Sequence, residues 1–143
     1  MHEGTVMAFD FGTRRIGVAV GEMMLGIARP LTTISAEANE ARFTAIGKLI
    51  AEWQPGTLLV GLPLSLDGEA TEMTERCRRF ARQLEGRYRL PVVLADERLT
   101  STSADERLRE RGRDWRERKA AVDAEAAAIL LQSHFDASRR PSP

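Results

Sequence analysis

Residues 5–21 read TVMAFDFGTRRIGVAVG, two apolar runs separated by one glycine and three polar residues. Alternation in the first run places Val6, Ala8 and Asp10 on one face of a strand. The second run alternates between bulky and small side chains, so one face of it is nearly bare. The stretch therefore predicts two antiparallel strands that are joined by a short connection at Gly12.

The rest of the chain alternates between apolar runs and helical periodicity. Residues 26–34 favour a third strand, in which Pro30 is expected at a sheet edge or a bulge because proline has no backbone N–H to donate. Helices are predicted at 39–53, 73–84, near 100–106 and at 121–135, and strands buried on both faces at 57–61 and 91–95. This order predicts an α/β protein with a mixed five-stranded sheet, an antiparallel meander of three strands plus two parallel strands, flanked by helices.

Length and composition predict one globular domain. The chain has 143 residues, of which 43% are apolar and 29% charged, and these values are close to the averages for globular proteins. We expect a single domain over residues 1–143, with a mobile loop within 109–119 and a disordered tail at 136–143. The one cysteine, Cys77, lies on the apolar stripe of a predicted helix, which favours a buried thiol and excludes an intramolecular disulfide. No apolar stretch reaches the roughly 18 residues of a membrane helix, so we expect a cytoplasmic protein without membrane association.

Charge is balanced overall but unevenly distributed. The sequence has 21 basic and 21 acidic residues, with the acidic excess in the first 75 residues and the basic excess after them. Arginines concentrate in residues 76–89 and 107–119. This asymmetry indicates a polyanionic partner, and Arg113, Arg116 and Lys119 are candidate phosphate contacts. The alternative interpretation is a solvated helix face in an arginine-rich protein.

Carboxylates at the ends of apolar segments are the candidate chemical groups, because an unpaired charge is costly to bury. Asp10 ends the first strand, Asp96 and Glu97 end the last one, and Asp123 begins an apolar helix. If these elements meet at one rim of the sheet, the acids could hold Mg²⁺ or Mn²⁺, the ions that oxygen ligands favour. Two such ions can promote phosphodiester hydrolysis.

We expect the nearby glycines to let the backbone of a polymeric substrate come close to these acids. They are Gly12, Gly17 and Gly21.

Each acid also has a purely structural interpretation. Asp10 could initiate the turn at Gly12, and Asp123 could interact with the helix dipole. Asp96 and Glu97 point to opposite faces of a strand, and periodicity alone does not say which of them faces Asp10. The two histidines, His2 and His134, are expected on the surface.

Four ordered motifs resemble the YqgF family, also called RuvX-like, of pre-16S rRNA nucleases and Holliday-junction-resolvase-like proteins. The motifs are DFGTRRIGVAV at 10–20, VGLP at 60–63 with DG at 67–68, DERLTS at 96–101, and VD at 122–123 leading into AAAIL at 126–130. The resemblance spans residues 5–132 and implies a ribonuclease-H-like fold.

The resemblance also implies roles for individual residues. It makes Asp10, Glu97 and Asp123 the catalytic and metal-binding acids. It makes Arg15, Arg98 and Thr100 supports for a phosphate or the active site. It places a loop beside the site that contains Gly61, Pro63, Ser65 and Gly68, with serine where the family usually has asparagine. Related resolvases carry a fourth acid at the position of Ala126.

The expected function is metal-dependent hydrolysis of phosphodiester bonds in 5′-end processing of the 16S rRNA precursor. One alternative is a DNA-branch resolvase, which would require a dimer to make paired cuts. Another is a nucleic-acid-binding module without catalysis. The first motif also looks like a phosphate loop of actin-like kinases, but those enzymes close two such domains over ATP. We expect structured RNA as partner, with ribosomal or nuclease proteins as further candidates, and a monomer or weak homodimer.

Overall fold

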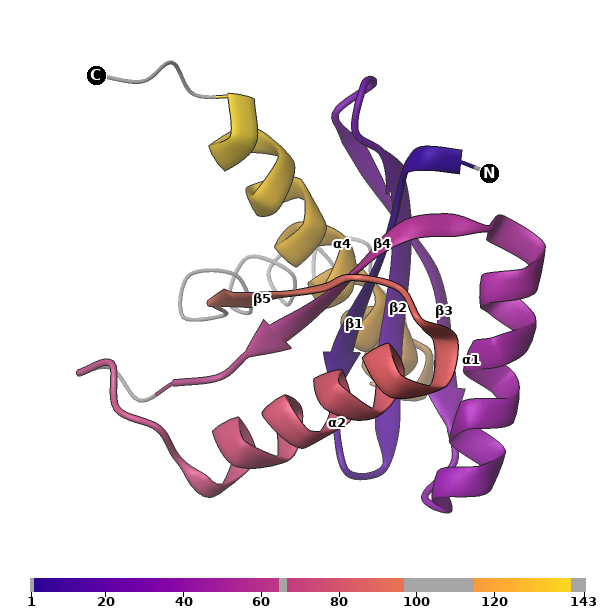
Figure 1. The fold of residues 1–143 in the computed structure, drawn as a ribbon. Coiled ribbons are helices and arrows are strands. Elements are labelled where there is room, and N and C mark those ends of the chain that lie inside the picture. The colour runs from indigo at the N-terminus through magenta and orange to yellow at the C-terminus, as the bar shows by residue number, and fades with distance from the viewer. Residues whose placement is uncertain (1, 65–66, 97–114, 140–143) are drawn as a thin grey trace.

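The computed structural model describes residues 2–64, 67–96 and 115–139. Within them the chain forms three strands, a helix, and then strands and helices in alternation (Figure 1). The elements are β1 (His2–Phe11), β2 (Arg15–Glu22), β3 (Ile27–Ser35), α1 (Asn39–Trp53), β4 (Pro55–Leu62), α2 (Glu72–Tyr88), β5 (Val92–Asp96) and α4 (Trp115–Arg139). The helix predicted near 100–106 lies outside the described residues.

The five strands form one mixed sheet in the order β3-β2-β1-β4-β5. β1, β2 and β3 pair antiparallel, whereas β4 and β5 continue the sheet in parallel from β1. The predicted meander plus two parallel strands is therefore confirmed. Pro30 lies on the edge strand β3 next to an irregularity in its pairing with β2, as expected for a residue without a backbone N–H.

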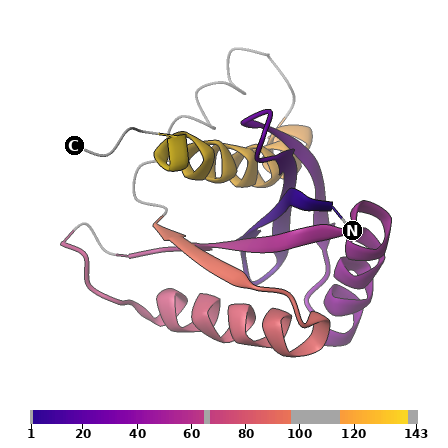
Figure 2. The same ribbon diagram turned by 45° about the horizontal axis from the view of Figure 1, so that its top comes forward.

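Two hydrophobic cores cover the two faces of the sheet. One contains Met7 and Phe9 of β1 with buried residues of α1 and α2. The other contains Val6 and Ala8 with the apolar side chains of α4. Figure 2 shows α4 on one side of the sheet and α2 on the other. The alternation predicted for the first strand is confirmed, and it places Asp10 on the α4 face because Asp10 continues the series of Val6 and Ala8.

Helix α4 packs on the bare face of β2. A Cβ atom added to Gly17 would lie 1.8 Å from the carbonyl oxygen of Asp123, and one added to Gly21 would lie 2.8 Å from the Phe135 ring. The expectation that these two glycines admit a polymeric substrate is therefore wrong, because the helix of the same chain takes that space. Their small size positions α4 and, with it, Asp123.

Helix α4 is longer than the sequence pattern predicted. It begins at Trp115, so residues 115–119 are helical instead of a mobile loop, and it continues to Arg139, so residues 136–139 are not a disordered tail. Arginine, glutamate, lysine and alanine favour helix strongly, and a polar turn can extend a helix that is already anchored. Phe135, 1% exposed, provides that anchor near the C-terminal end.

The last strand also differs from its prediction. Val93 and Leu94 of β5 are 37% and 42% exposed, so β5 is not buried on both faces. The reason is its position at the edge of the sheet. Cys77, in contrast, is 1% exposed within the core beneath α2, as predicted. No helix among the described residues has the length and apolarity needed to cross a membrane.

Candidate active site

Asp10 and Asp123 both lie beside Gly17 of β2 although more than a hundred residues separate them in the sequence. Asp10 is partly buried and lies opposite Gly17 in the antiparallel pairing of β1 with β2. Paired residues of neighbouring strands point to the same face. Because the Asp123 backbone packs directly on Gly17, the first turns of α4 carry Asp123 to the level of Asp10.

The positions beside Asp10 on this face are small. Gly17 is its neighbour on β2. On the other side, the pairing of Phe9 with Val60 places Gly61 next to the level of Asp10, and Gly61 in turn pairs with Ala95 of β5. Gly61 and Ala95 therefore place no large side chain beside Asp10, whereas the Asp123 backbone fills the space over Gly17.

Arg15 contacts one of the two acids directly. Its Nε donates to Asp123 Oδ2 at 2.5 Å, and the two side chains are 33% and 22% exposed. The family resemblance implied that Arg15 supports a phosphate or the active site. The structure brings it to the site, but onto a carboxylate.

The pairing of β5 shows on which face of the sheet Asp96 lies. Asp96 pairs with Leu62, which packs toward the core under α1 and α2, whereas Ala95 contacts the α4 core. Asp96 therefore lies on the face opposite to Asp10. Glu97 itself is outside the described residues, and so are Arg98, Thr100, Arg113, Ser65 and the side chains of Arg116 and Lys119.

The loop after β4 is held by local structure. The carbonyl of Pro63 accepts a hydrogen bond from the Thr74 hydroxyl of α2. Gly68 has a φ of 87°, a conformation that favours glycine. At the β1–β2 turn, a Cβ on Gly12 would lie 2.5 Å from the Arg15 carbonyl oxygen. Gly12 and Gly68 thus shape turns at the two loops that border Asp10 and Gly61.

Arg42 is a supporting residue that the sequence analysis did not single out. It is only 4% exposed, and its guanidinium donates to the carbonyl oxygens of Gly12, Thr13 and Ala36 and lies over the Phe11 ring. Burial lowers the pKa of Arg42, and the Glu37 carboxylate opposes that shift. The available signal was an arginine four residues before Ile46, on the buried stripe of α1.

We expect the substitution Arg42→Met to lower the free energy of unfolding by about 2–4 kcal/mol, because it leaves carbonyl groups of the β1–β2 turn without a donor. Urea denaturation measures the change. The matched control is Arg14→Met, since the Arg14 side chain is 82% exposed and only 3.6 Å from Glu37; it should change stability by less than about 0.5 kcal/mol. Equal effects of the two substitutions would contradict the supporting role of Arg42.

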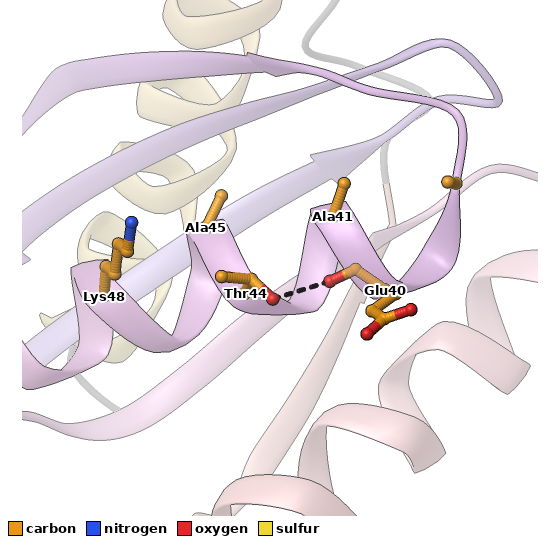
Figure 3. A pocket seen from close by; sticks show the side chains of 6 residues that line it. Glu40, Ala41, Thr44, Ala45 and Lys48 are labelled. Atoms are coloured by element: carbon orange, nitrogen blue, oxygen red, sulfur yellow. Dashed lines mark hydrogen bonds between the residues drawn. The ribbon is translucent and has the colours of Figure 1, made fainter.

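A shallow pocket runs along α1, and its lining includes neither Asp10 nor Asp123. Figure 3 shows the side chains that line it. It lies beside a helix that packs on the face of the sheet opposite α4. Among the described residues that line it, only Glu40 and Lys48 are ionisable, and the Thr44 hydroxyl donates to the Glu40 backbone carbonyl at 2.8 Å. This lining contains a single carboxylate, that of Glu40, so the pocket lacks the paired acids that the sequence analysis expects of the active site.

Comparison with known proteins identifies the class. The family model "RuvX: Holliday junction resolvase" matches residues 4–137, and the chain belongs to this family. A Methylobacillus flagellatus protein named "Putative pre-16S rRNA nuclease" is 56% identical over 133 residues, 93% of this chain and 91% of the relative. A Dechloromonas aromatica protein of the same name is 56% identical over 140 residues, 98% of this chain and 96% of the relative.

Two solved structures share the fold. The Fowlpox virus resolvase, solved with Holliday junction DNA, has a TM-score of 0.61 at 7% identity and matches 95% of this chain and 99% of its own. RuvC of T. thermophilus, solved with a Holliday junction substrate, has a TM-score of 0.54 at 16% identity, with 94% of each chain covered. The fold is ribonuclease-H-like, as the motifs implied. Family and relatives identify the chain as a nuclease, a hydrolase of phosphodiester bonds.

Proposed function

We propose that this protein is a divalent-metal-dependent endonuclease that cleaves structured RNA during 5′-end maturation of the 16S rRNA precursor. The observation that carries the proposal is the convergence of Asp10 and Asp123 on one face of the sheet, beside Gly17. The names of the relatives support the precursor as the substrate. In this role the enzyme acts in the cytoplasm, where the precursor is made.

The described residues fit a metal centre in their chemistry. Asp10 and Asp123 offer carboxylate oxygens from two different elements, and such oxygen ligands favour Mg²⁺ or Mn²⁺. The described residues alone provide no group of three or more acids, histidines or cysteines placed to hold a metal. Glu97, two positions beyond Ala95, is the third ligand in our proposal.

In the proposed hydrolysis, some side chains hold the metal ion and others contact the phosphate. A divalent ion at such a site lowers the pKa of water and stabilises negative charge on phosphoryl oxygens. Asp10, Glu97 and Asp123 hold the ion, while Arg15, Arg98 and Thr100 contact the phosphate. Cleavage of the P–O3′ bond leaves a 5′-phosphate and a 3′-hydroxyl.

In this proposal the sheet and α4 together offer three acidic ligands, one fewer than related resolvases carry. The position of the fourth acid is Ala126, which is 9% exposed. Fewer carboxylates bind a second divalent ion less tightly. We therefore expect slow intrinsic cleavage at low metal concentration.

The N-terminal part of α4 and the segment before it supply the nucleic-acid contacts in this proposal. The double substitution Arg113→Ala with Arg116→Ala should weaken RNA binding and reduce the slope of log K against log salt by about 1–2, because each lost phosphate contact removes close to one released counterion. Filter binding of precursor RNA over a salt series measures both quantities. Unchanged affinity and slope would exclude these arginines from the interface.

The substrate preference is tested by measuring cleavage of an RNA and of a branched DNA. End-labelled 16S precursor RNA and a synthetic four-way DNA junction are incubated with the protein in Mn²⁺ or in EDTA. The proposal predicts metal-dependent cleavage of the RNA. Symmetric cleavage of the junction would instead establish the resolvase function, and binding without cleavage of either substrate would favour a non-catalytic module or the need for a ribosomal or nuclease partner.

A further inference from the structure

The Arg15–Asp123 ion pair joins two residues that the proposed function assigns to different partners. Arg15 Nε lies 2.5 Å from Asp123 Oδ2, a short contact between charged groups. Charge-assisted hydrogen bonds of this kind are about twice as strong as neutral ones. The carboxylate is therefore already neutralised by a cation that belongs to the protein.

The surrounding structure fixes this pair in place. Arg15 is the first residue of β2, two positions before Gly17 on the same strand, and Gly17 contacts the Asp123 backbone. The two side chains therefore approach each other from a rigid strand and the helix packed on it. Both are less than two-fifths exposed, so solvent screens the pair less than a surface ion pair.

We propose that Arg15 is an internal competitor of the divalent ion: its guanidinium and the metal exchange on the Asp123 carboxylate, and the released guanidinium contacts the phosphate of the substrate. The inference rests on the proposed function, since it requires a metal at Asp10 and Asp123. It assigns Arg15 a positioning role that couples metal binding to phosphate binding. The Arg15 guanidinium beside the Asp123 carboxylate offsets the negative charge that a divalent ion would otherwise meet there.

Arg14 provides a matched control for charge. It is the preceding residue and carries the same charge, but its side chain is 82% exposed and its partner is Glu37 at 3.6 Å. Removing Arg14 changes the net charge near the site as much as removing Arg15 does. It leaves the Asp123 ion pair intact.

The test measures Mn²⁺ binding to the full chain. Electron paramagnetic resonance detects the free ion during the titration. Arg15→Gln should bind Mn²⁺ about fivefold more tightly than the wild type, because the metal no longer displaces a cation. Arg14→Gln should change the dissociation constant by less than about twofold. Weaker or unchanged Mn²⁺ binding by Arg15→Gln would overturn the inference, since a purely structural ion pair would position Asp123 for the metal.

A second measurement follows the exchange in the wild-type protein. The Arg15 Nε–H resonance is assigned by its loss in Arg15→Gln and observed during titration with Mg²⁺. Exchange predicts a saturable upfield shift of that proton as its hydrogen bond to Asp123 breaks. A resonance that stays unchanged while Mg²⁺ binds would show that Arg15 keeps its partner and would overturn the inference.

Failure of the proposed function gives a different result. If Asp10→Asn binds Mn²⁺ as tightly as the wild type, the metal site itself is elsewhere and the proposed function fails. If Asp10→Asn loses Mn²⁺ while Arg15→Gln gains nothing, the site is correct and only the exchange is wrong.

Discussion

Replacing Asp10 with asparagine is expected to lower the rate constant for RNA cleavage by about three orders of magnitude. The amide keeps the shape of the side chain but removes the negative charge that holds the metal, and a loss of about 4 kcal/mol of transition-state stabilisation corresponds to that factor. Single-turnover cleavage of end-labelled precursor RNA measures the rate constant. The effect should fall on catalysis, because Asp10 is only partly buried at the end of its strand.

Asp136→Asn is the matched control for this substitution. Asp136 is exposed on α4 and accepts a hydrogen bond from Gln132 at 3.1 Å, more than three turns away from Asp123. The Asp136→Asn protein should cleave precursor RNA at the wild-type rate. An Asp10→Asn protein with wild-type stability and a rate within tenfold of the wild type would show that Asp10 is not a metal ligand.

Gly17→Ala is expected to have the largest effect on stability. The added Cβ would lie 1.8 Å from the Asp123 carbonyl oxygen and 2.9 Å from the Ala124 nitrogen, both backbone atoms of α4. Neither the strand nor the helix can move without opening the core between them, so we expect a loss of about 3 kcal/mol or more in the free energy of unfolding. Cleavage should fall too, because the helix carries Asp123.

Gly86→Ala is the control that makes the same glycine-to-alanine change at an uncrowded position. It tests whether the loss of stability comes from the crowding at Gly17. Gly86 lies within α2, and an added Cβ would meet no atom within 4 Å. Alanine favours helix over glycine, so this substitution should raise stability by about 0.5–1 kcal/mol. Urea denaturation of both variants gives the comparison, and a Gly17→Ala protein as stable as the wild type would contradict the packing of α4 on β2.

Local patterns were sufficient to predict most of the sheet. Alternation in the first strand separated Phe9 from Asp10 correctly, and the missing donor of Pro30 predicted its place at an edge and an irregularity. The bare face of β2 was also predicted. What fills that face was not, because a row of glycines shows that something approaches closely without identifying it as α4.

The site depends on contacts that no local pattern contains. The Arg15–Asp123 pair joins residues 108 positions apart, and its existence depends on where α4 crosses β2. Arg42 reaches the β1–β2 turn only because α1 returns beside it. The exposure of β5 follows from its edge position, since an apolar composition alone cannot distinguish a central strand from an edge strand.

Metal rescue of Asp10→Cys shows whether Asp10 binds the catalytic metal. A thiolate binds Mg²⁺ poorly and softer ions such as Cd²⁺ well. Cys77, the one natural cysteine, is buried and should not interfere. We expect the wild type to cleave precursor RNA in Mg²⁺ and not in EDTA, and Asp10→Cys to be inactive in Mg²⁺ and to recover at least tenfold in Cd²⁺. Cleavage by the wild type in EDTA, or wild-type cleavage by Asp10→Cys in Mg²⁺, would contradict this expectation.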